Sequence, residues 1–210
     1  MKNLIITAES LEITRDIAAK IDGDTFHHHF HVLSDIASLY STNESLTYVE
    51  IGCYAGASAC LMLQRPLTNV VSIDIGKPVS PKIPLANAEK LNPHNNDYQY
   101  IKGNSQSRWT VRKPQKIINE IDILFIDGDH SYEGVRKDFL LYHKLVKRDG
   151  YIIFDDYKDH EFSPEVKPSV DDIVDEFAAF FEVIGCLDNK HNAHPDSLAE
   201  NNCFIIRKNL

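Results

Sequence analysis

The sequence is poor in the features that mark disulfide-stabilised, zinc-binding and membrane proteins. Only four of its 210 residues are cysteines, at positions 53, 60, 186 and 203, and none belongs to a C-x-x-C pair. We therefore expect reduced thiols and no structural zinc. No apolar run approaches the roughly 18 residues of a membrane-spanning helix, and the first twenty residues lack the apolar core of a signal peptide. These absences predict a cytoplasmic chain without a membrane partner.

Positive charge is also scarce. The chain has 22 lysines and arginines against 31 aspartates and glutamates, which gives a formal net charge of −9. Such a charge repels nucleic-acid phosphates unless basic residues cluster, and no basic run is longer than a pair such as Lys147-Arg148. We therefore expect no nucleic-acid partner. Apolar residue types make up 43% of the chain, which favours a globular protein of one domain.

Short β-branched runs alternate with segments of helical spacing along the chain. This alternation is typical of a parallel sheet covered by helices. The last two runs are joined by a polar stretch without helical spacing, so we expect an antiparallel hairpin at the sheet edge. The predicted fold is a doubly wound α/β fold with a mostly parallel seven-stranded sheet. Its expected strands are residues 46–51, 69–75, 98–102, 121–127, 151–155, 181–187 and 203–208, and its expected helices are 58–64, 85–90, 132–146 and 170–180.

A histidine cluster precedes the first predicted strand. Residues 27–31 read His-His-His-Phe-His and continue into an amphipathic helix over residues 32–40. His27 and His31, four apart on a helix, could share a metal, and the cluster could also contact a substrate. A solvated helix start is the more common role for such residues. We expect residues 1–44 to form a helical cap that belongs to the same domain as the sheet.

The first predicted strand ends in a glycine-containing turn that leads directly into a helix. Gly52 and Gly56 allow the positive φ and close backbone approach that such a turn needs, and its amides could bind an anion. Their spacing departs from the G-x-G-x-x-G pattern of dinucleotide sites. Glu50 would attract an ammonium, and Asp74, 22 residues after Gly52, stands near the usual position of a ribose-binding acid. Together these residues predict an adenosine ligand that carries an amino acid; the alternative is an ordinary glycine turn with a solvent-facing Glu50.

Acidic residues follow the fourth and fifth predicted strands. Asp127 ends the fourth strand, and Asp155 and Asp156 end the fifth. Because neighbouring parallel strands end at one crevice, we expect the three carboxylates to converge. Their mutual repulsion favours a bound cation, and oxygen ligands select a hard ion such as Mg²⁺, with Mn²⁺ or Ca²⁺ as alternatives. The other interpretation is that these aspartates cap turns.

These motifs resemble those of class I S-adenosylmethionine-dependent methyltransferases. The segment Glu50-x-Gly52-x-x-x-Gly56 is similar to the first motif of that family, and residues 102–107 resemble the adenine-facing turn of catechol-type O-methyltransferases. Residues 126–135 and 150–157 resemble the metal-dependent branch that includes macrolide sugar O-methyltransferases and cephalosporin hydroxylase-like proteins. The resemblance implies a methyltransferase domain over residues 45–210.

The resemblance also implies the ligands and the residues that hold them. The methyl donor would be S-adenosylmethionine, with a divalent metal beside it, and the acceptor would be a hydroxylated small molecule such as a sugar or a vicinal diol. Chains of this type often form homodimers. The implied metal ligands are Asp127, Asp155 and Asp156. The implied donor-binding residues are Glu50, Gly52, Tyr54, Gly56, Ser58, Asp74, Asn104, Ser105 and Asp127.

Methyl transfer to oxygen also needs a proton acceptor. A metal would orient two adjacent hydroxyls and lower their pKa. His130 follows Asp127 by three residues, where the catechol enzymes have a lysine, and could remove the proton because its reference pKa is about 6.5. Asp129 is the alternative base. Three further side chains could line the acceptor site, although packing or solvation explains them equally well: Trp109, Tyr157 and His160.

Two other classes of function stay open on the sequence alone. A non-catalytic protein that binds S-adenosylmethionine or a metal would keep the same donor-binding residues. A nucleotide-dependent oxidoreductase is disfavoured, because the chain has neither the G-x-G-x-x-G turn nor a His-x-Asp segment followed by a second histidine, the triad of non-haem iron oxygenases.

Overall fold

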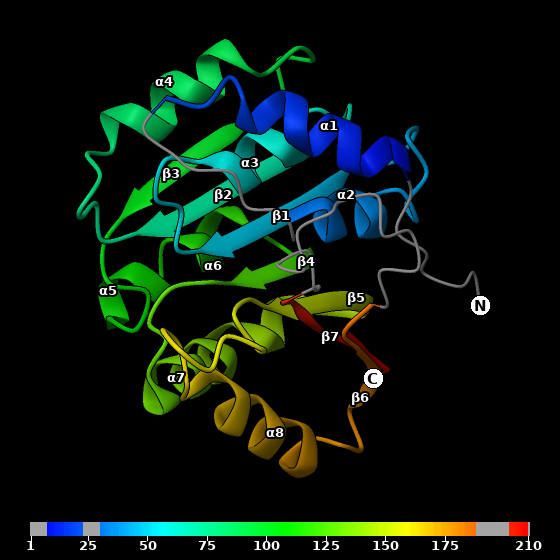
Figure 1. Ribbon diagram of the computed structural model, residues 1–210, viewed down its shortest axis with the longest axis vertical. Helices are drawn as coiled ribbons and strands as arrows, with labels where there is room; N and C mark the ends of the chain where they lie inside the picture. The colour runs from blue at the N-terminus through cyan, green and yellow to red at the C-terminus, as the bar shows by residue number, and fades with distance from the viewer. Residues whose placement is uncertain (1–7, 23–29, 188–201, 210) are drawn as a thin grey trace.

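The structure, a computed structural model, describes residues 8–22, 30–187 and 202–209, which fold around one twisted sheet (Figure 1). Within these residues the sheet has seven strands in the order β3-β2-β1-β4-β5-β7-β6. The predicted doubly wound, mostly parallel sheet is confirmed. The strands are β1 (Leu46–Ile51), β2 (Thr68–Asp74), β3 (Tyr98–Lys102), β4 (Ile121–Ile126), β5 (Val146–Phe154), β6 (Phe181–Gly185) and β7 (Phe204–Lys208).

Strand β7 alone runs against the direction of its neighbours. The strands from β3 to β5 pair in parallel, whereas β7 pairs antiparallel with both β5 and β6. The predicted antiparallel pair at the sheet edge is therefore confirmed, with β7 inserted between β5 and β6. Because β1 to β5 are parallel, their carboxyl ends meet at one edge, which is where doubly wound folds bind ligands.

Helices cover both faces of the sheet (Figure 1). Buried apolar residues form a separate core on each face, and successive residues of one strand serve different cores: Tyr48 packs in one and Val49 in the other. Strands buried on both faces read as continuous apolar runs, which is why the sequence revealed them. One face carries α1 (Ala8–Ala18), α2 (His31–Ala37), α3 (Ala57–Met62) and α4 (Lys82–Lys90). The other carries α5 (Arg108–Val111), α6 (Pro114–Ile117), α7 (Tyr132–Tyr142) and α8 (Val166–Glu176).

Several element boundaries differ from the sequence predictions. The helix predicted over residues 132–146 ends at Tyr142, a 3₁₀ helix, η2 (His143–Leu145), follows, and β5 then starts five residues earlier than expected. The polar residues 147–149 concealed this start; Arg148 and Asp149 are exposed, and the β4–β5 register shifts between Val146 and Tyr151. The helix α8 starts four residues before its predicted position. The helix α1 lies within the expected N-terminal helical cap, for which no helix bounds were predicted there. The helices α5 and α6 were not predicted, because elements of four residues are too short to produce a periodic pattern.

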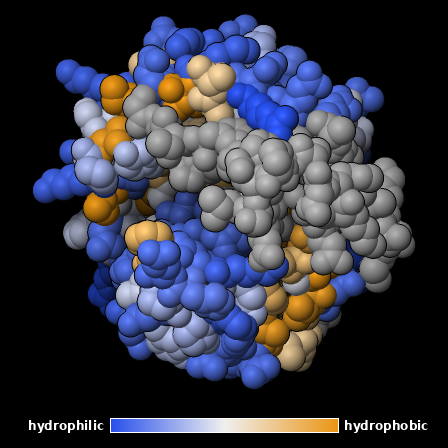
Figure 2. Space-filling model, viewed as in Figure 1, coloured by the Kyte–Doolittle hydropathy of each residue, from blue (hydrophilic) through white to orange (hydrophobic). Residues whose placement is uncertain are grey.

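The surface agrees with the charge balance of the chain. Most of the described surface seen in Figure 2 is hydrophilic, and apolar side chains gather near the outer strand β6, where Phe180 and Val183 are each 49% exposed.

No helix in the described part of the chain is long and apolar enough to cross a membrane. The four cysteines are free thiols. His27 lies outside the described residues. His31 is buried at the start of α2, so the solvated helix start expected for this cluster is wrong at His31.

The ring of Phe139 provides a test of the core between α7 and the sheet. It is fully buried, and its centroid lies 5.1 Å from that of Phe177 and 5.7 Å from that of Phe181. We expect Phe139→Ala to lower the free energy of unfolding by about 3–5 kcal/mol, because truncation leaves a cavity among packed rings. The adjacent Leu140, 38% exposed, is the control, and Leu140→Ala should cost less than about 1 kcal/mol. Denaturant unfolding of both variants measures the difference, and equal losses would contradict the packing described here.

Candidate active site

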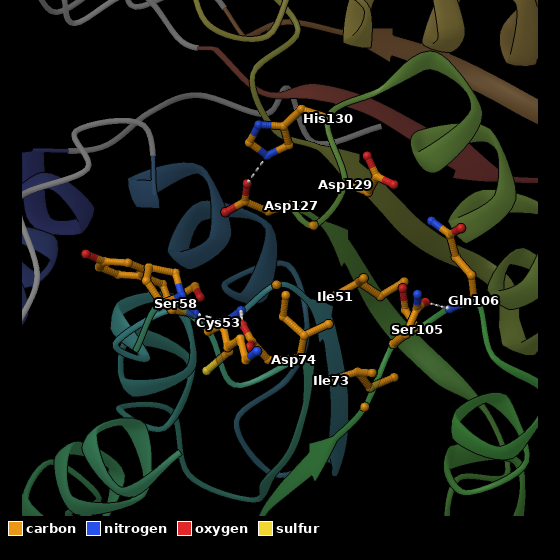
Figure 3. A pocket seen from close by; sticks show the side chains of 18 of the residues that line it. Ile51, Cys53, Ser58, Ile73, Asp74, Ser105, Gln106, Asp127, Asp129 and His130 are labelled. Atoms are coloured by element: carbon orange, nitrogen blue, oxygen red, sulfur yellow. Dashed lines mark hydrogen bonds and ion pairs between the residues drawn. The ribbon is translucent and has the colours of Figure 1, made fainter. Parts of the chain in front are cut away.

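A cavity of about 640 Å³ opens at the carboxyl ends of the parallel strands. Five segments line it: Phe30 directly before α2, the end of β1 with the turn that follows it, the end of β2 with the residues that follow it, the turn after β3 and the turn after β4 (Figure 3). Eight of the predicted site residues contribute to its wall, whereas Glu50, Gly56, Asp155 and Asp156 do not. The eight are Gly52, Tyr54, Ser58, Asp74, Asn104, Ser105, Asp127 and His130.

Glycine is required where the turn after β1 meets the turn after β4. Gly52 has a φ of +86°, and a Cβ there would lie 1.7 Å from the carbonyl oxygen of Asp127. A side chain at this position would force the two turns apart. Gly56 has a φ of +88° and stands directly before α3. The predicted positive φ at both glycines is confirmed, and the close backbone approach explains why the wall can bring β1 and β4 together.

The carboxylate of Asp74 joins the end of β2 to the glycine turn. Its Oδ2 accepts hydrogen bonds from the backbone amides of Cys53 at 2.8 Å and Tyr54 at 3.1 Å, and its Oδ1 accepts one from the amide of Gly76 at 2.5 Å. The expectation that the amides of this turn receive a ligand anion is therefore wrong for Cys53 and Tyr54. Asp74 nevertheless lines the cavity, as a ribose-binding acid must.

Glu50 lies behind the wall of the cavity. It is fully buried, and its oxygens accept hydrogen bonds from the hydroxyls of Ser58 at 2.5 Å, Ser72 at 2.6 Å and Tyr48 at 2.9 Å. Burial raises the pKa of Glu50, and these hydrogen bonds oppose the rise. The expected direct contact between Glu50 and a ligand ammonium is not supported, because Glu50 does not line the cavity. Glu50 instead positions Ser58, which does line it.

The turn after β3 is held by a buried acid that the sequence analysis did not identify. Ser105 donates a hydrogen bond from its hydroxyl to Oδ1 of Asp138, a fully buried residue of α7, at 2.7 Å. Burial raises the pKa of Asp138 to about 6. Oδ1 of Asn104 accepts a hydrogen bond from the amide of Gln106 at 2.7 Å, which closes the turn. These contacts hold Ser105 and Gln106 at the cavity wall.

His130 stands between two carboxylates that come from neighbouring strand ends. Its Nε2 lies 3.2 Å from Oδ1 of Asp127, and its Nδ1 lies 3.3 Å from Oδ2 of Asp156 and 3.0 Å from Oγ of Ser163. Burial and the charge of Asp155 raise the pKa of Asp127. The hydrogen bond to Asp127 raises the pKa of His130, and burial opposes this rise. In its protonated form the imidazole can therefore balance the charge of these carboxylates. It accepts a proton only in its neutral form, which a cation bound nearby would favour.

The geometry of this cluster fits a hard divalent cation. One ligand atom from each of Asp127, His130 and Asp156 lies within 4.8 Å of the others. This set differs from the predicted one, because it includes His130 and leaves out Asp155. Asp155 is only 5% exposed, and its Oδ1 accepts a hydrogen bond from the thiol of Cys203 at 3.5 Å. Oxygen-rich sites of this charge suit Mg²⁺, Mn²⁺ or Ca²⁺.

Asp129, the predicted alternative base, also lines the cavity, whereas the other three predicted side chains lie outside its wall. Trp109 is 78% exposed and His160 is exposed. Tyr157 donates a hydrogen bond from its hydroxyl to Asp171 at 2.7 Å and packs against Phe204, so it stabilises the loop after β5. None of the three lines the cavity in the described part of the chain.

Comparison with known proteins identifies the family of this chain. A model described as a methyltransferase domain matches residues 49–157, from β1 through the turn after β5. The chain belongs to the methyltransferase family. It is also 43% identical over 178 residues to the uncharacterized protein R132 of Acanthamoeba polyphaga mimivirus, a match that covers 80% of this chain and 79% of that protein.

Solved structures share the fold of this methyltransferase. The O-methyltransferase NovP matches with a TM-score of 0.64 at 16% identity and covers 96% of this chain and 97% of its own. An O-methyltransferase from Bacillus cereus, in complex with SAH, matches with a TM-score of 0.62 at 18% identity, over 99% of this chain and 94% of its own. The mycinamycin-pathway methyltransferase MycE, in complex with Mg and SAH, matches with a TM-score of 0.62 at 15% identity, over 97% of this chain and 55% of its own. At these identities the likeness concerns the fold, and it confirms the predicted architecture.

Sequence reasoning missed several residues of this methyltransferase site. Phe30, Lys77 and Gln106 line the cavity, and only Gln106 gave a signal, because it belongs to the turn that resembles the catechol enzymes. Ser163 and Asn202 hold Asp156 through hydrogen bonds of 2.9 Å and 3.0 Å. Neither belongs to a recognisable motif, so the sequence offered no signal for them.

Gly52 provides a test of the contact between the two turns. We expect Gly52→Ala to destabilise the methyltransferase by more than backbone strain alone, because the new Cβ collides with the carbonyl of Asp127. Gly185 is the matched control, since its φ is +78° and no atom lies within 4 Å of a Cβ placed there. Gly185→Ala should cost only the roughly 1–2 kcal/mol of a left-handed alanine. Equal losses in denaturant unfolding would show that the Gly52 contact imposes no constraint.

Proposed function

We propose that this methyltransferase transfers a methyl group from S-adenosylmethionine to a hydroxyl oxygen of a small molecule, assisted by a divalent metal. The acceptor class that we propose is a sugar or a vicinal diol. One observation carries the proposal: a single cavity joins the glycine turn and Asp74 at one end to Asp127 and His130 at the other. A donor and a reacting hydroxyl can therefore meet within one cavity.

The wall of the cavity supports an adenosine-containing donor. Ile51 and Ile73 provide apolar surface, Asp74 provides carboxylate oxygens for ribose hydroxyls, and Ser105 and Gln106 provide polar groups for a base. Because Gly52 lets the turn after β1 lie against the turn after β4, the donor-binding residues and Asp127 line the same cavity. The similar Bacillus cereus O-methyltransferase is in complex with SAH, the demethylated donor, which agrees with this assignment.

The acidic cluster supports a bound metal. The proposed ligands are Asp127 and Asp156, and the charge of the buried Asp155 acts on Asp127. Mg²⁺ is the proposed ion, with Mn²⁺ or Ca²⁺ as alternatives. Such an ion, when bound, orients adjacent hydroxyls and lowers their pKa. The similar methyltransferase MycE is in complex with Mg, which agrees with this choice.

His130 is the proposed proton acceptor. Its ring lines the cavity beside Asp127, and Ser163 and Asp156 hold the opposite nitrogen, so the ring has a defined orientation. Asp129 is a weaker candidate. Burial alone would raise the pKa of its carboxyl, but hydrogen bonds from Ser131 lower it below its usual value. A base with a lowered pKa accepts a proton less readily.

The remaining expectations about partners stay predictions. A homodimer, a cytoplasmic location and the absence of nucleic-acid and membrane partners rest on composition and resemblance. The alternative function is a non-catalytic protein that binds S-adenosylmethionine or a metal. The oxidoreductase alternative has no support from the site, since the turn after β1 keeps two of its amides engaged by Asp74.

Donor binding and methyl transfer test the proposal separately. The protein should bind S-adenosylmethionine but not NADH in calorimetric titration, and it should methylate members of a panel of sugars and vicinal diols. EDTA should abolish the transfer and added Mg²⁺ should restore it, while Asp127→Ala should remain inactive in both conditions. Failure to bind the donor would overturn the proposal. Donor binding without transfer across the panel would favour the non-catalytic alternative, and transfer that resists EDTA would remove the metal.

The role of His130 has its own test. We expect His130→Ala to lower kcat by about 10²–10⁴-fold, the usual contribution of a general base, and to leave the affinity for S-adenosylmethionine nearly unchanged. His160, an exposed histidine outside the cavity wall, is the matched control, and His160→Ala should keep full activity. Turnover of His130→Ala at the wild-type rate would exclude the proposed base.

A further inference from the structure

The antiparallel strand β7 brings two residues opposite the acidic pair that follows β5. In the register of these strands Phe154 pairs with Phe204. Continuing the same register by one and two residues sets Asp155 opposite Cys203 and Asp156 opposite Asn202. The dipeptide that begins the β7 segment therefore faces the dipeptide that ends the β5 segment.

Asn202 makes three hydrogen bonds to the acidic segment. Its Nδ2 donates to Oδ1 of Asp156 at 3.0 Å, its Oδ1 accepts from the amide of Lys158 at 2.7 Å, and its carbonyl oxygen accepts from the amide of Tyr157 at 2.9 Å. Asp156 has a φ of +57°, a left-handed conformation that non-glycine residues rarely adopt without support. Asn202 thus supports both the side chain of Asp156 and the unusual backbone around it.

Cys203 makes the corresponding contact one residue further along. Its Sγ lies 3.5 Å from Oδ1 of Asp155, and the thiol is the donor. Both side chains are buried, with Cys203 fully inaccessible and Asp155 5% exposed. A buried carboxylate keeps a fixed direction only when its oxygens have hydrogen-bond donors.

We infer that Asn202 and Cys203 are positioning residues: Asn202 sets the direction of the Asp156 carboxylate, a proposed ligand of a divalent metal, and Cys203 holds the adjacent Asp155 carboxylate, whose charge adds to the acidic cluster. The inference rests on the proposed function, because it presumes a metal at the acidic cluster. Neither residue contacts the cavity directly, so each acts through the carboxylate that it holds. Partners of metal-ligating carboxylates generally matter for affinity, and their removal costs about 10–100-fold.

The inference also gives β7 a role beyond closing the sheet. A parallel strand in its place would not oppose these residues in the same way, because antiparallel pairing sets the two dipeptides directly across from each other. Asn202 is separated from Asp156 by 46 residues of chain. The C-terminal segment is thereby connected to the chemistry at the end of β5.

Binding of Mn²⁺ to the full-length protein, without donor or acceptor, tests the inference. Calorimetric titration should give a dissociation constant at least about tenfold higher for Asn202→Ala than for the wild type. Asn96 is the matched control, because its side chain makes three hydrogen bonds to backbone groups away from the cluster, at Leu63, Arg65 and Thr68. Asn96→Ala should lower the melting temperature as Asn202→Ala does but leave the Mn²⁺ affinity unchanged.

A second pair of variants tests the role of the Cys203 thiol without changing the charge of the protein. Cys203→Ser keeps a donor of similar size and should bind Mn²⁺ within about twofold of the wild type, whereas Cys203→Ala removes the donor and should bind several-fold more weakly. Melting temperatures measured without metal separate loss of folding from loss of affinity.

The ways in which the inference can fail are distinguishable. If the wild type binds Mn²⁺ and the Asn202→Ala variant, folded by its melting curve, binds it equally well, the positioning role is wrong while the metal site stands. If affinity falls equally in Asn202→Ala and Asn96→Ala, the effect is general destabilisation and the inference is again wrong. If the wild type binds no Mn²⁺, both the inference and the metal part of the proposed function are overturned, whereas donor binding is unaffected.

Discussion

The concentration of negative charge at the ends of β4 and β5 is the constraint on which the site depends. Asp127 and Asp156 approach His130 from opposite sides, and the nearby charge of Asp155 raises the pKa of Asp127. Carboxylates that gather in a partly buried site are unfavourable unless donors or cations balance them. The fold supplies an imidazole, two neutral side-chain donors and a thiol from three separate segments. A divalent cation would balance the same charge more completely, which explains why this arrangement suits a metal.

Hydrogen-bond donors also surround the two acidic residues at the end of the cavity where the methyl donor would bind, but only one of these acids lines the cavity. Glu50 is surrounded by three hydroxyl donors and fully withdrawn from the cavity, whereas Asp74 is held by backbone amides and keeps a place in the wall. Each acid therefore fixes a part of the wall before any ligand arrives. Groups that are already oriented lose less entropy on binding, so this rigidity favours a well-defined donor position.

The parts of the fold that were predicted correctly are those with local causes. The bounds of β1 and β3 agree with the predicted residues 46–51 and 98–102. Strand β1 was recognised because a strand buried on both faces is a nearly continuous apolar run in the sequence. The N-terminal end of α8 was misplaced, since its first turn includes polar residues and Pro168 that obscure the apolar spacing. Likewise, Asp138 and Ser163 were missed, because each reaches its partner across 33 residues of chain.

The sequence by itself determined where the glycine turn, the acids and the strands lie along the chain, because turn sterics and apolar periodicity are properties of neighbouring residues. It could not determine which acids face the cavity. That choice was made by the tertiary structure, which buries Glu50 among hydroxyls, sets His130 between two carboxylates and brings Asn202 opposite Asp156. These relations depend on strand register and on packing between distant segments, and both are established only when the helices pack against the two faces of the sheet.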